Sequence, residues 1–316
     1  MRTIHTLEEA DLSAPSHVTI GAFDGVHRGH RHLIGLMVEA AHEVGRVAIT
    51  LTFDPHPGAV LGRSPVAALS TIEERGELLA EIGVDLLVVL RFTPAIAGLP
   101  AERFVAKLLR DLRMAELWAG PDFALGHRRE GDIASLQELG ARKGFLVRLV
   151  EPLRWKGEVV SSTRIRAALT AGEIEEANDC LDRPYRLAGT VIRGRGLGST
   201  LGIPTANLEP PESRLIPANG VYACFARAEE ETWPAVVNVG VRPTIATDHL
   251  TVEAHLLGFE GDLYGERLEL DFIARLRDEE VFPSLNALVA QIRDDIASAE
   301  RVLVSRRERV DSREPA

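Results

Sequence analysis

Two histidines three positions apart, His27 and His30, mark the first place where this sequence could do chemistry. They lie in GAFDGVHRGH, Gly21 to His30, which follows an apolar stretch and opens a helical one. On a helical turn this spacing puts both imidazoles on one face, and Gly29 lacks the side chain that would keep a nucleotide at a distance. A strand-to-helix junction also presents unpaired amide N–H groups and the positive helix end, which favour a phosphate. The segment therefore predicts a site that stabilises charge on a phosphoryl group under attack.

Two other interpretations of this segment stay open. The histidines could be polar residues at a helix start, with Gly25 and Gly29 as turn glycines. A zinc site is the second, although no cysteine or acidic third ligand is obvious nearby. The position directly after a strand and before a helix favours the phosphate site.

Three further segments place polar side chains in the same half of the chain. FDPHP, residues 53–57, taken alone indicates a stiff loop. GPDFALGHRREGD, residues 120–132, is either a solvated loop or a flexible basic loop over a phosphate. SSTRIRAAL, residues 161–169, is either an ordinary helix cap or a second anion site, where hydroxyls and amides meet a triphosphate and an arginine neutralises pyrophosphate.

A second group of candidate residues lies near the middle and end of the chain. LGIPTAN, residues 201–207, follows several glycines, but GxxxxGK[ST] is absent, so this is not a P-loop. Thr205 and Asn207 offer hard oxygen donors suited to Mg²⁺, and the alternative is a proline turn followed by an asparagine in a bend. In LTVEAHLLGF, period two puts Glu253 on the face opposite Val252, so composition alone predicts a solvated strand residue.

The elements that must position these residues fall into two groups along the chain. Through about residue 183, five apolar runs alternate with amphipathic stretches, which predicts strands at 17–23, 46–53, 84–92, 115–120 and 145–153 in a parallel, doubly wound sheet. From Tyr185 to about Leu276, short alternating segments between glycine and proline turns predict an antiparallel barrel or sandwich, followed by a helix to about Leu303. We therefore expect domains at 1–184 and 185–304, with a charged, disordered tail at 305–316.

Composition limits the class of protein. A chain of 316 residues with 45% hydrophobic composition favours two domains. A net charge of −11 argues against nonspecific nucleic-acid binding. Cys180 and Cys224 form no CxxC pair, and neither a leader nor an apolar run long enough for a membrane is present, so we expect a cytoplasmic protein without membrane contact. The sequence gives no indication of the oligomeric state.

The ordered set GAFDGVHRGH, FDPHP, GPDFALGHRREGD and SSTRIR resembles the adenylyltransferase half of the bacterial bifunctional riboflavin kinase/FAD synthetase family. GTVIRGRGLGSTLGIPTAN, residues 189–207, resembles the opening of its kinase half, so the likeness covers the chain apart from the tail. The resemblance implies a Rossmann-like nucleotidyltransferase domain and a riboflavin kinase β-barrel. It implies that Mg²⁺ and ATP convert riboflavin to FMN with release of ADP, and FMN to FAD with release of pyrophosphate.

The resemblance also implies roles for individual residues. The catalytic residues would be His27, His30 and Glu253, the last as the base for the ribityl 5′-hydroxyl. In the adenylyltransferase half, ATP would contact Gly21, Phe23, Asp24, Gly25, Gly29, Ser162, Thr163 and Arg166, and flavin would contact Phe53, Asp54, Pro55, His56, Asp122 and Phe123. In the kinase half, ATP would contact Gly189, Gly196, Gly198, Leu201, Gly202 and Pro204, flavin would contact Arg275 and Glu279, and Mg²⁺ would bind Thr205 and Asn207.

The sequence departs from the family in its kinase loop. The family usually has an arginine between glycines there, whereas this chain has Gly196-Leu197-Gly198-Ser199 with Arg193 and Arg195 upstream. This predicts weaker kinase turnover or ATP affinity unless Arg195 compensates. A milder change is Leu125, where an aromatic residue is common.

Two alternative functions follow from the same motifs. One is a monofunctional FMN adenylyltransferase whose barrel binds flavin without catalysis, and the other is a flavin-binding storage or sensor protein. Retention of His27, His30, Thr205, Asn207 and Glu253 argues against both, because a binding module needs no base.

Overall fold

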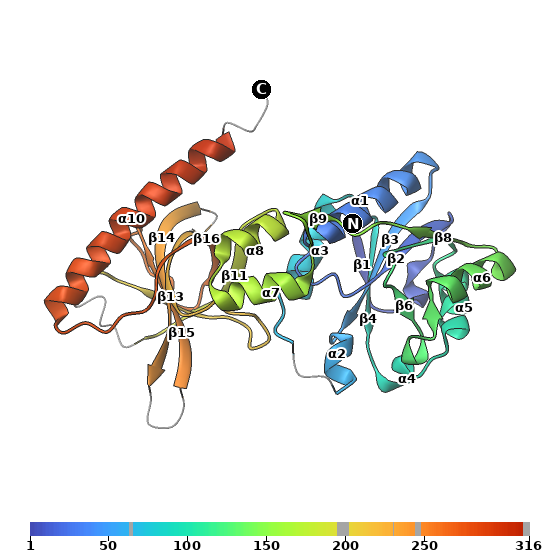
Figure 1. The fold of residues 1–316 in the computed structure, drawn as a ribbon, viewed down its shortest axis with the longest axis horizontal. Coiled ribbons are helices and arrows are strands. Elements are labelled where there is room, and N and C mark those ends of the chain that lie inside the picture. The colour runs from blue at the N-terminus through green and yellow to red at the C-terminus, as the bar shows by residue number, and fades with distance from the viewer. Residues whose placement is uncertain (63–65, 195–201, 230, 244–247, 312–316) are drawn as a thin grey trace. The chain divides into compact units, whose positions relative to one another are not determined.

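The computed structural model describes residues 1–62, 66–194, 202–229, 231–243 and 248–311 (Figure 1). Contacts within the chain divide it into two compact units, Met1–Ser162 and Thr163–Ala316. Each unit contains its own main sheet, so each is described by itself.

The first unit is built on a parallel sheet of six strands, which confirms the predicted fold class. The strand order is β1-β4-β3-β2-β5-β8. The strands are β1 Arg2–Ile4, β2 Ser16–Ile20, β3 Val47–Asp54, β4 Leu86–Arg91, β5 Met114–Ala119 and β8 Leu146–Leu149. In β2 all five residues are buried, as expected for a parallel strand covered on both faces. The three residues of β1 are too few to show a period, and sequence analysis did not predict that strand.

Helices cover both faces of this sheet. They are α1 Arg28–Glu43, α2 Pro57–Val60, α3 Ile72–Glu81, α4 Pro94–Ala97, α5 Ala101–Asp111 and α6 Ile133–Lys143, with short 3₁₀ helices at Glu8–Ala10 and His127–Arg129. One apolar cluster joins α1 and α3 to the sheet through Ile34 and Leu79, and a second joins α5 and α6 through Leu108 and Leu136. Two small hairpins, β6 Ala124–Leu125 with β7 Gly131–Asp132 and β9 Arg154–Trp155 with β10 Glu158–Val159, lie in the connections.

The second unit contains a closed antiparallel barrel, in agreement with the predicted alternation. Its order is β11-β12-β15-β14-β13-β16. The strands are β11 Tyr185–Ile192, β12 Ala206–Glu209, β13 Gly220–Ala228, β14 Glu231–Pro243, β15 Asp248–Leu256 and β16 Arg267–Arg277. Inward residues such as Val237, Val252 and Leu270 fill the core. Sequence analysis did not predict β12, because four residues directly after a proline turn give no alternation to recognise.

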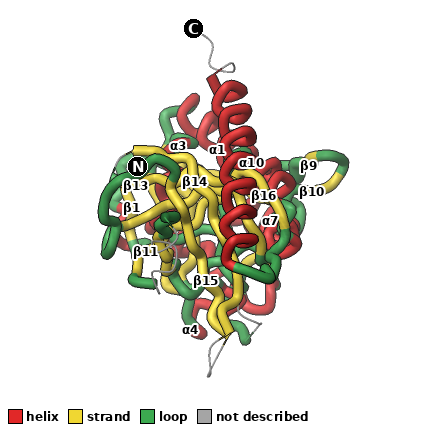
Figure 2. The backbone as a smooth tube through the Cα atoms, turned by 90° about the vertical axis from the view of Figure 1, so that its left-hand side faces the viewer, coloured by secondary structure: helices red, strands yellow, loops and turns green. Residues whose placement is uncertain are grey.

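The terminal helix is longer than predicted. Helix α10, Leu285–Asp311, lies across the barrel strands and packs on β13 and β14 through Ala299 and Leu303 (Figure 2). It continues through the start of the segment that was expected to be a disordered tail. The guanidinium of Arg307 lies 5.0 Å from the ring centroid of Phe225, so contact with the barrel extends beyond the last apolar residue that the pattern revealed.

Two helices that precede the barrel in sequence belong to its unit. They are α7 Ser162–Ala171 and α8 Ile174–Leu181. The Asn178 amide donates to the Phe272 carbonyl at 2.8 Å and accepts from the Tyr185 N–H at 2.7 Å. The two compact units divide after Ser162, and the predicted domain boundary at residue 184 stays a prediction.

Candidate functional site

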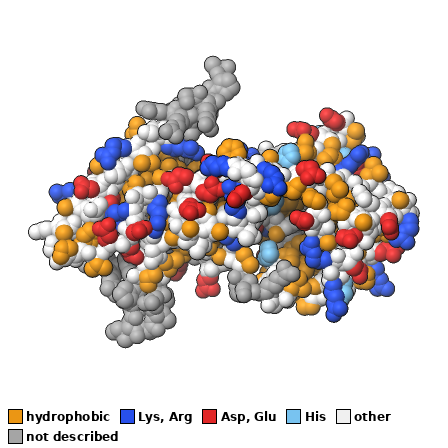
Figure 3. Space-filling model, in the orientation of Figure 1, with side chains coloured by type: hydrophobic (Ala, Val, Ile, Leu, Met, Phe, Trp, Pro, Cys, Tyr) orange, Lys and Arg blue, Asp and Glu red, His pale blue; other side chains and the backbone are white. Residues whose placement is uncertain are grey.

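A phosphate bound by this chain must be bound by a few neighbouring polar groups, and not by a broad basic surface. The net charge is −11, and acidic and basic side chains are intermingled over the face drawn in Figure 3. A broad basic surface is not seen on that face. Helix ends and individual polar residues are therefore the groups that could bind a phosphate.

The turn between β2 and α1 brings the two histidines together, as their spacing predicted. His27 is the N-cap of α1, and its Nδ1 accepts the His30 backbone N–H at 3.3 Å. The two imidazole rings are stacked with centroids 3.6 Å apart and planes 18° apart. His30 also meets the edge of Phe23 at 5.2 Å. Two imidazoles therefore lie side by side at the amino end of a helix, where charge on a phosphoryl group can be stabilised.

Gly29 is closely packed in the first turn of α1. A Cβ at this position would lie 3.2 Å from Cε1 of His27 and 3.3 Å from the Val160 carbonyl oxygen. Gly29 therefore allows the His27 ring and the chain at Val160 to pack against the first turn of α1. The predicted role of Gly29 beside a nucleotide stays a prediction.

Ser162, the last residue of the first unit, lies next to the histidine turn. The Ser162 hydroxyl donates to the backbone carbonyl of Asp24 at 2.9 Å. Thr163 is exposed at the start of α7, and Arg164 is paired with Glu176 of α8.

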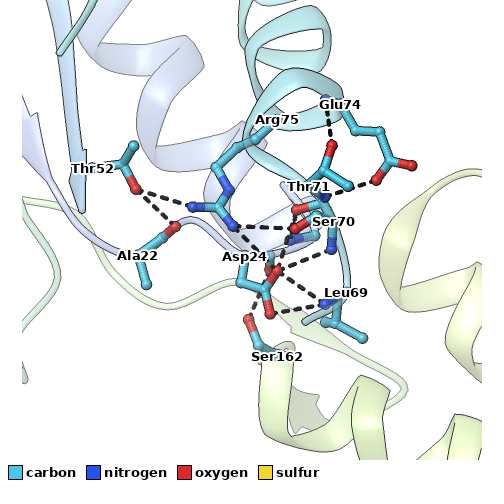
Figure 4. Close-up of polar contacts among 10 residues, drawn as sticks. Ala22, Asp24, Thr52, Leu69, Ser70, Thr71, Glu74, Arg75 and Ser162 are labelled. Atoms are coloured by element: carbon cyan, nitrogen blue, oxygen red, sulfur yellow. Dashed lines mark hydrogen bonds and ion pairs between the residues drawn. The ribbon is translucent and has the colours of Figure 1, made fainter. Parts of the chain in front are cut away.

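Asp24 is buried, and its carboxylate is bonded to protein donors. The side chain accepts the N–H groups of Leu69 and Ser70 at 3.0 Å, and the residue is 4% exposed (Figure 4). The predicted contact of Asp24 with ATP stays a prediction. These bonds assign its carboxylate to the interior of the protein.

The residues predicted to contact flavin in the first unit lie at the carboxyl end of β3 and just beyond it, and beyond the carboxyl end of β5. Phe53 and Phe123 are half-buried and pack on the same apolar cluster. His56 caps α2, where its Nδ1 accepts the Gly58 N–H at 3.1 Å. Asp122 is exposed, and its carbonyl accepts from Arg129 at 2.6 Å.

A row of polar residues crosses the outer face of the barrel. Glu253 of β15 pairs in register with Asn207 of β12 on one side and Asn238 of β14 on the other. Val252 and Ala254, its neighbours along the strand, are buried on the opposite face. The alternation expected from the sequence therefore holds, and it sets a carboxylate between two amides.

Arg275 and Glu279 are both packed closely against glycines. The Arg275 guanidinium pairs with Asp278 at 2.9 Å, and its Nε lies within 2.9 Å of the Cβ positions that side chains at Gly172 and Gly220 would occupy. A Cβ at Gly240, two residues beyond Asn238 on the same strand face, would lie 2.0 Å from Glu279 Oε1. The Glu279 carboxylate therefore lies against the backbone of Gly240, next to the row that contains Glu253.

The predicted ATP contacts of the kinase half are described only in part. A Cβ at Gly189 would lie 2.4 Å from the Glu209 carbonyl oxygen, so this glycine permits close pairing of β11 with β12. Gly202 has a positive φ of 74°, and the Pro204 carbonyl oxygen lies 2.7 Å from His255 Nδ1. Three predicted residues lie outside the described residues, namely Gly196, Gly198 and Leu201, as does the departure at Leu197 and Ser199.

Comparison with known proteins assigns each half of the chain to a family. Residues 10–164 match the FAD synthetase family model, and residues 181–303 match that of riboflavin kinase. A bifunctional riboflavin kinase/FMN adenylyltransferase from Pseudomonas fluorescens is 39% identical over 285 residues, which are 89% of this chain and 91% of that protein. The protein of that name from Escherichia coli K12 is 36% identical over 304 residues, 95% of this chain and 96% of that protein. The chain belongs to the bifunctional riboflavin kinase/FMN adenylyltransferase family.

A solved structure has the same fold over nearly the whole chain. The crystal structure of a macrolide-efflux protein from Streptococcus pneumoniae aligns with a TM-score of 0.87 and 28% identity, covering 95% of this chain and 98% of that one. In the part of the present chain that the structure describes, no helix is long and apolar enough to cross a membrane.

One residue near the first site was missed by sequence analysis. Phe92 directly follows β4, and its ring centroid lies 5.2 Å from that of Phe53. An aromatic residue at the end of a predicted strand was a usable signal for Phe92. In the barrel, Asn238 completes the row with Glu253, and only strand pairing brings these two residues side by side.

Proposed function

We propose that the first unit adenylylates FMN to FAD and that the barrel phosphorylates riboflavin to FMN, each with ATP. The observation that carries the proposal is that each half, as matched to its family, contains its own set of candidate catalytic side chains. The first half has the stacked His27 and His30 at a helix start, and the second has Glu253 between two asparagines.

In adenylyl transfer, an oxygen of the FMN phosphate attacks the α-phosphorus of ATP. A new P–O bond forms, the bond from the α-phosphorus to the bridging oxygen breaks, and pyrophosphate leaves. His27, His30 and the first amides of α1 stabilise the negative charge that builds on the α-phosphoryl group. Ser162 binds a phosphate of ATP, which its bond to the histidine turn supports. The same role for Thr163 and Arg166 rests on the resemblance to the family alone. The flavin lies toward Phe53 and Phe123.

In phosphoryl transfer, the ribityl 5′-hydroxyl of riboflavin attacks the γ-phosphorus of ATP and ADP leaves. The Glu253 carboxylate orients the hydroxyl and accepts its proton late in the reaction. Asn207 and Asn238 flank Glu253 in register on the barrel face. Arg275 and Glu279 contact the flavin of the bound riboflavin.

Thr205 and Asn207 would hold the magnesium ion of the kinase half. Both side chains are half-buried and offer a hydroxyl and an amide oxygen, which suit a cation that takes its other ligands from phosphates and water. Among the described residues, no group of three or more histidine, cysteine, aspartate or glutamate side chains could hold a metal ion. When bound, Mg²⁺ would neutralise negative charge on the phosphates of ATP.

The proposal is tested by chromatography of flavins after incubation with Mg-ATP and either riboflavin or FMN. We expect FMN and FAD from riboflavin, and FAD from supplied FMN. FAD from FMN without conversion of riboflavin would instead indicate a monofunctional adenylyltransferase. Formation of neither product, with flavin retained on the protein, would indicate a flavin-binding protein.

A further inference from the structure

The turn from Ala22 to Val26, which leads into His27, is bonded on several sides by side chains from distant segments. The Gly25 N–H donates to the Ser70 hydroxyl at 2.9 Å, and that hydroxyl donates to the Asp24 carboxylate at 3.2 Å. The Ala22 carbonyl accepts from Thr52 at 3.0 Å. Together with the Ser162 bond to the Asp24 carbonyl, these contacts reach the turn from three other segments of the chain (Figure 4).

Arg75 joins two of these contacts inside the protein. It is 6% exposed, and its Nη2 lies 3.4 Å from the Asp24 carboxylate. Its Nη1 donates to the Thr52 hydroxyl at 3.2 Å. A buried guanidinium and a buried carboxylate are each costly alone, so this ion pair is the arrangement in which both can occupy the interior.

The backbone of the turn depends on this support. Phe23 has a φ of 46° and Val26 a φ of 37°, in the left-handed region that aromatic and β-branched residues rarely adopt. Such a conformation persists where the surrounding structure holds it. The ring of His27 follows one residue after Val26, so a relaxed turn would displace the histidine.

We propose that Ser70 and Arg75 are positioning residues for adenylyl transfer. They fix the turn that sets His27 and, through Asp24, the contact with Ser162 at the start of α7. Neither residue was singled out by the motifs, because they lie 46 and 51 positions beyond Asp24 in the chain. The inference rests on the proposed adenylyltransferase activity of the first unit.

The alternative is that this network only stabilises the fold, and neighbouring residues distinguish the two roles. Thr71 follows Ser70 directly, and its hydroxyl accepts the Glu74 N–H at 3.2 Å as part of the cap of α3. Thr71→Ala removes a helix cap and Ser70→Ala removes the bond to the turn. Both should lower the unfolding temperature. Only Ser70→Ala should change the chemistry.

The experiment measures kcat and KM of the full-length protein for FAD formation from supplied FMN and ATP. For Ser70→Ala we expect kcat to fall by about tenfold to a hundredfold, as for a small misplacement of a catalytic group, with a smaller change in the KM for FMN. Riboflavin phosphorylation by the same preparation should stay within about twofold of the parent. Thr71→Ala should retain the parental kcat.

Arg75→Lys provides a second measurement that keeps the buried charge. Lysine lacks the planar fork that reaches Asp24 and Thr52 together, so kcat should fall here too. Parental kcat in both Ser70→Ala and Arg75→Lys, or an equal loss in Thr71→Ala, would overturn the positioning role. If the parent itself made no FAD from FMN, the proposed adenylyltransferase function would fail instead.

Discussion

The histidine turn of the first unit and the Glu253 row of the barrel hold polar groups in place by different means. The backbone from Ala22 to His27 follows no repeating pattern, and side chains from β3, α7 and the segment before α3 hold it. Glu253, by contrast, is held by the hydrogen-bonded ladder that joins β12, β15 and β14. A site on paired strands inherits its geometry from the fold, whereas a site on a turn needs partners of its own.

Removal of both histidines should produce the largest effect. His27→Ala with His30→Ala should lower FAD formation from FMN by roughly a hundredfold or more for each donor lost. Riboflavin phosphorylation should continue, because the stabilised charge is local. Initial rates with each substrate measure both reactions. A double variant that adenylylates FMN at the parental rate would show that the histidines are structural.

Substitution of the barrel carboxylate tests the strand-held site. Glu253→Gln preserves shape and hydrogen bonding but removes the proton acceptor, so FMN formation should fall by roughly two to four orders of magnitude. FAD synthesis from supplied FMN is the internal control and should continue. Riboflavin phosphorylation within a few-fold of the parent would exclude Glu253 as the base and direct attention to His255 on the same face.

Fragments of the second unit test how far the barrel depends on α7 and α8. A fragment from Tyr185 and one from Thr163 should both make FMN but no FAD. The shorter one should be less stable by about 3 kcal/mol, because it loses the Asn178 bonds and the buried side chains of α8. Denaturant unfolding compares them. FAD formation by either fragment would contradict the assignment of the reactions.

Two glycines of α1 test the close packing at the histidine turn. Gly29→Ala should lower adenylyl transfer by about tenfold, since the new methyl group would press on His27 and on the Val160 carbonyl. Gly35→Ala is the matched control, because nothing lies within 4 Å of its Cβ position. It should retain the parental rate and raise the free energy of unfolding by about 0.5–1 kcal/mol. Equal rates in the two variants would contradict the packing argument.

The smallest expected effect concerns His17, near the amino end of β2 and so at the opposite end of that strand from the histidine turn. His17 is buried, which lowers its pKa below the usual value of 6.5, while Arg46 lies 3.0 Å from its Nε2 and Glu116 3.9 Å. The folded state therefore binds fewer protons at His17 than the unfolded state does. This contribution to stability is complete above pH 6.5 and decreases as pH falls toward the lowered value.

Thermal unfolding between about pH 7.5 and pH 5.5 measures this contribution. The unfolding temperature of the parent should fall by a few degrees across this range, and His17→Gln should reduce that fall. Equal pH dependence in the two proteins would show that other groups are responsible.

The parts of the molecule that sequence analysis predicted are those in which apolar residues recur at a regular spacing along the chain. The strands and long helices of the first unit, the barrel, and the outward position of Glu253 all follow from alternation or helical spacing. The contacts that sequence analysis missed join residues far apart in the chain. Asn238 joins the Glu253 row only through strand pairing, and Arg75 meets Asp24 only after β3 and α3 are in place.

The cap that His27 makes on α1 also determines where the proton of its ring lies. Because Nδ1 accepts the His30 N–H, the neutral imidazole carries its hydrogen on Nε2. The helix thus selects one tautomer, and the ring can donate a hydrogen bond without first becoming a cation. A metal ion at Nε2 would have to displace that hydrogen, whereas a phosphate oxygen can accept it directly.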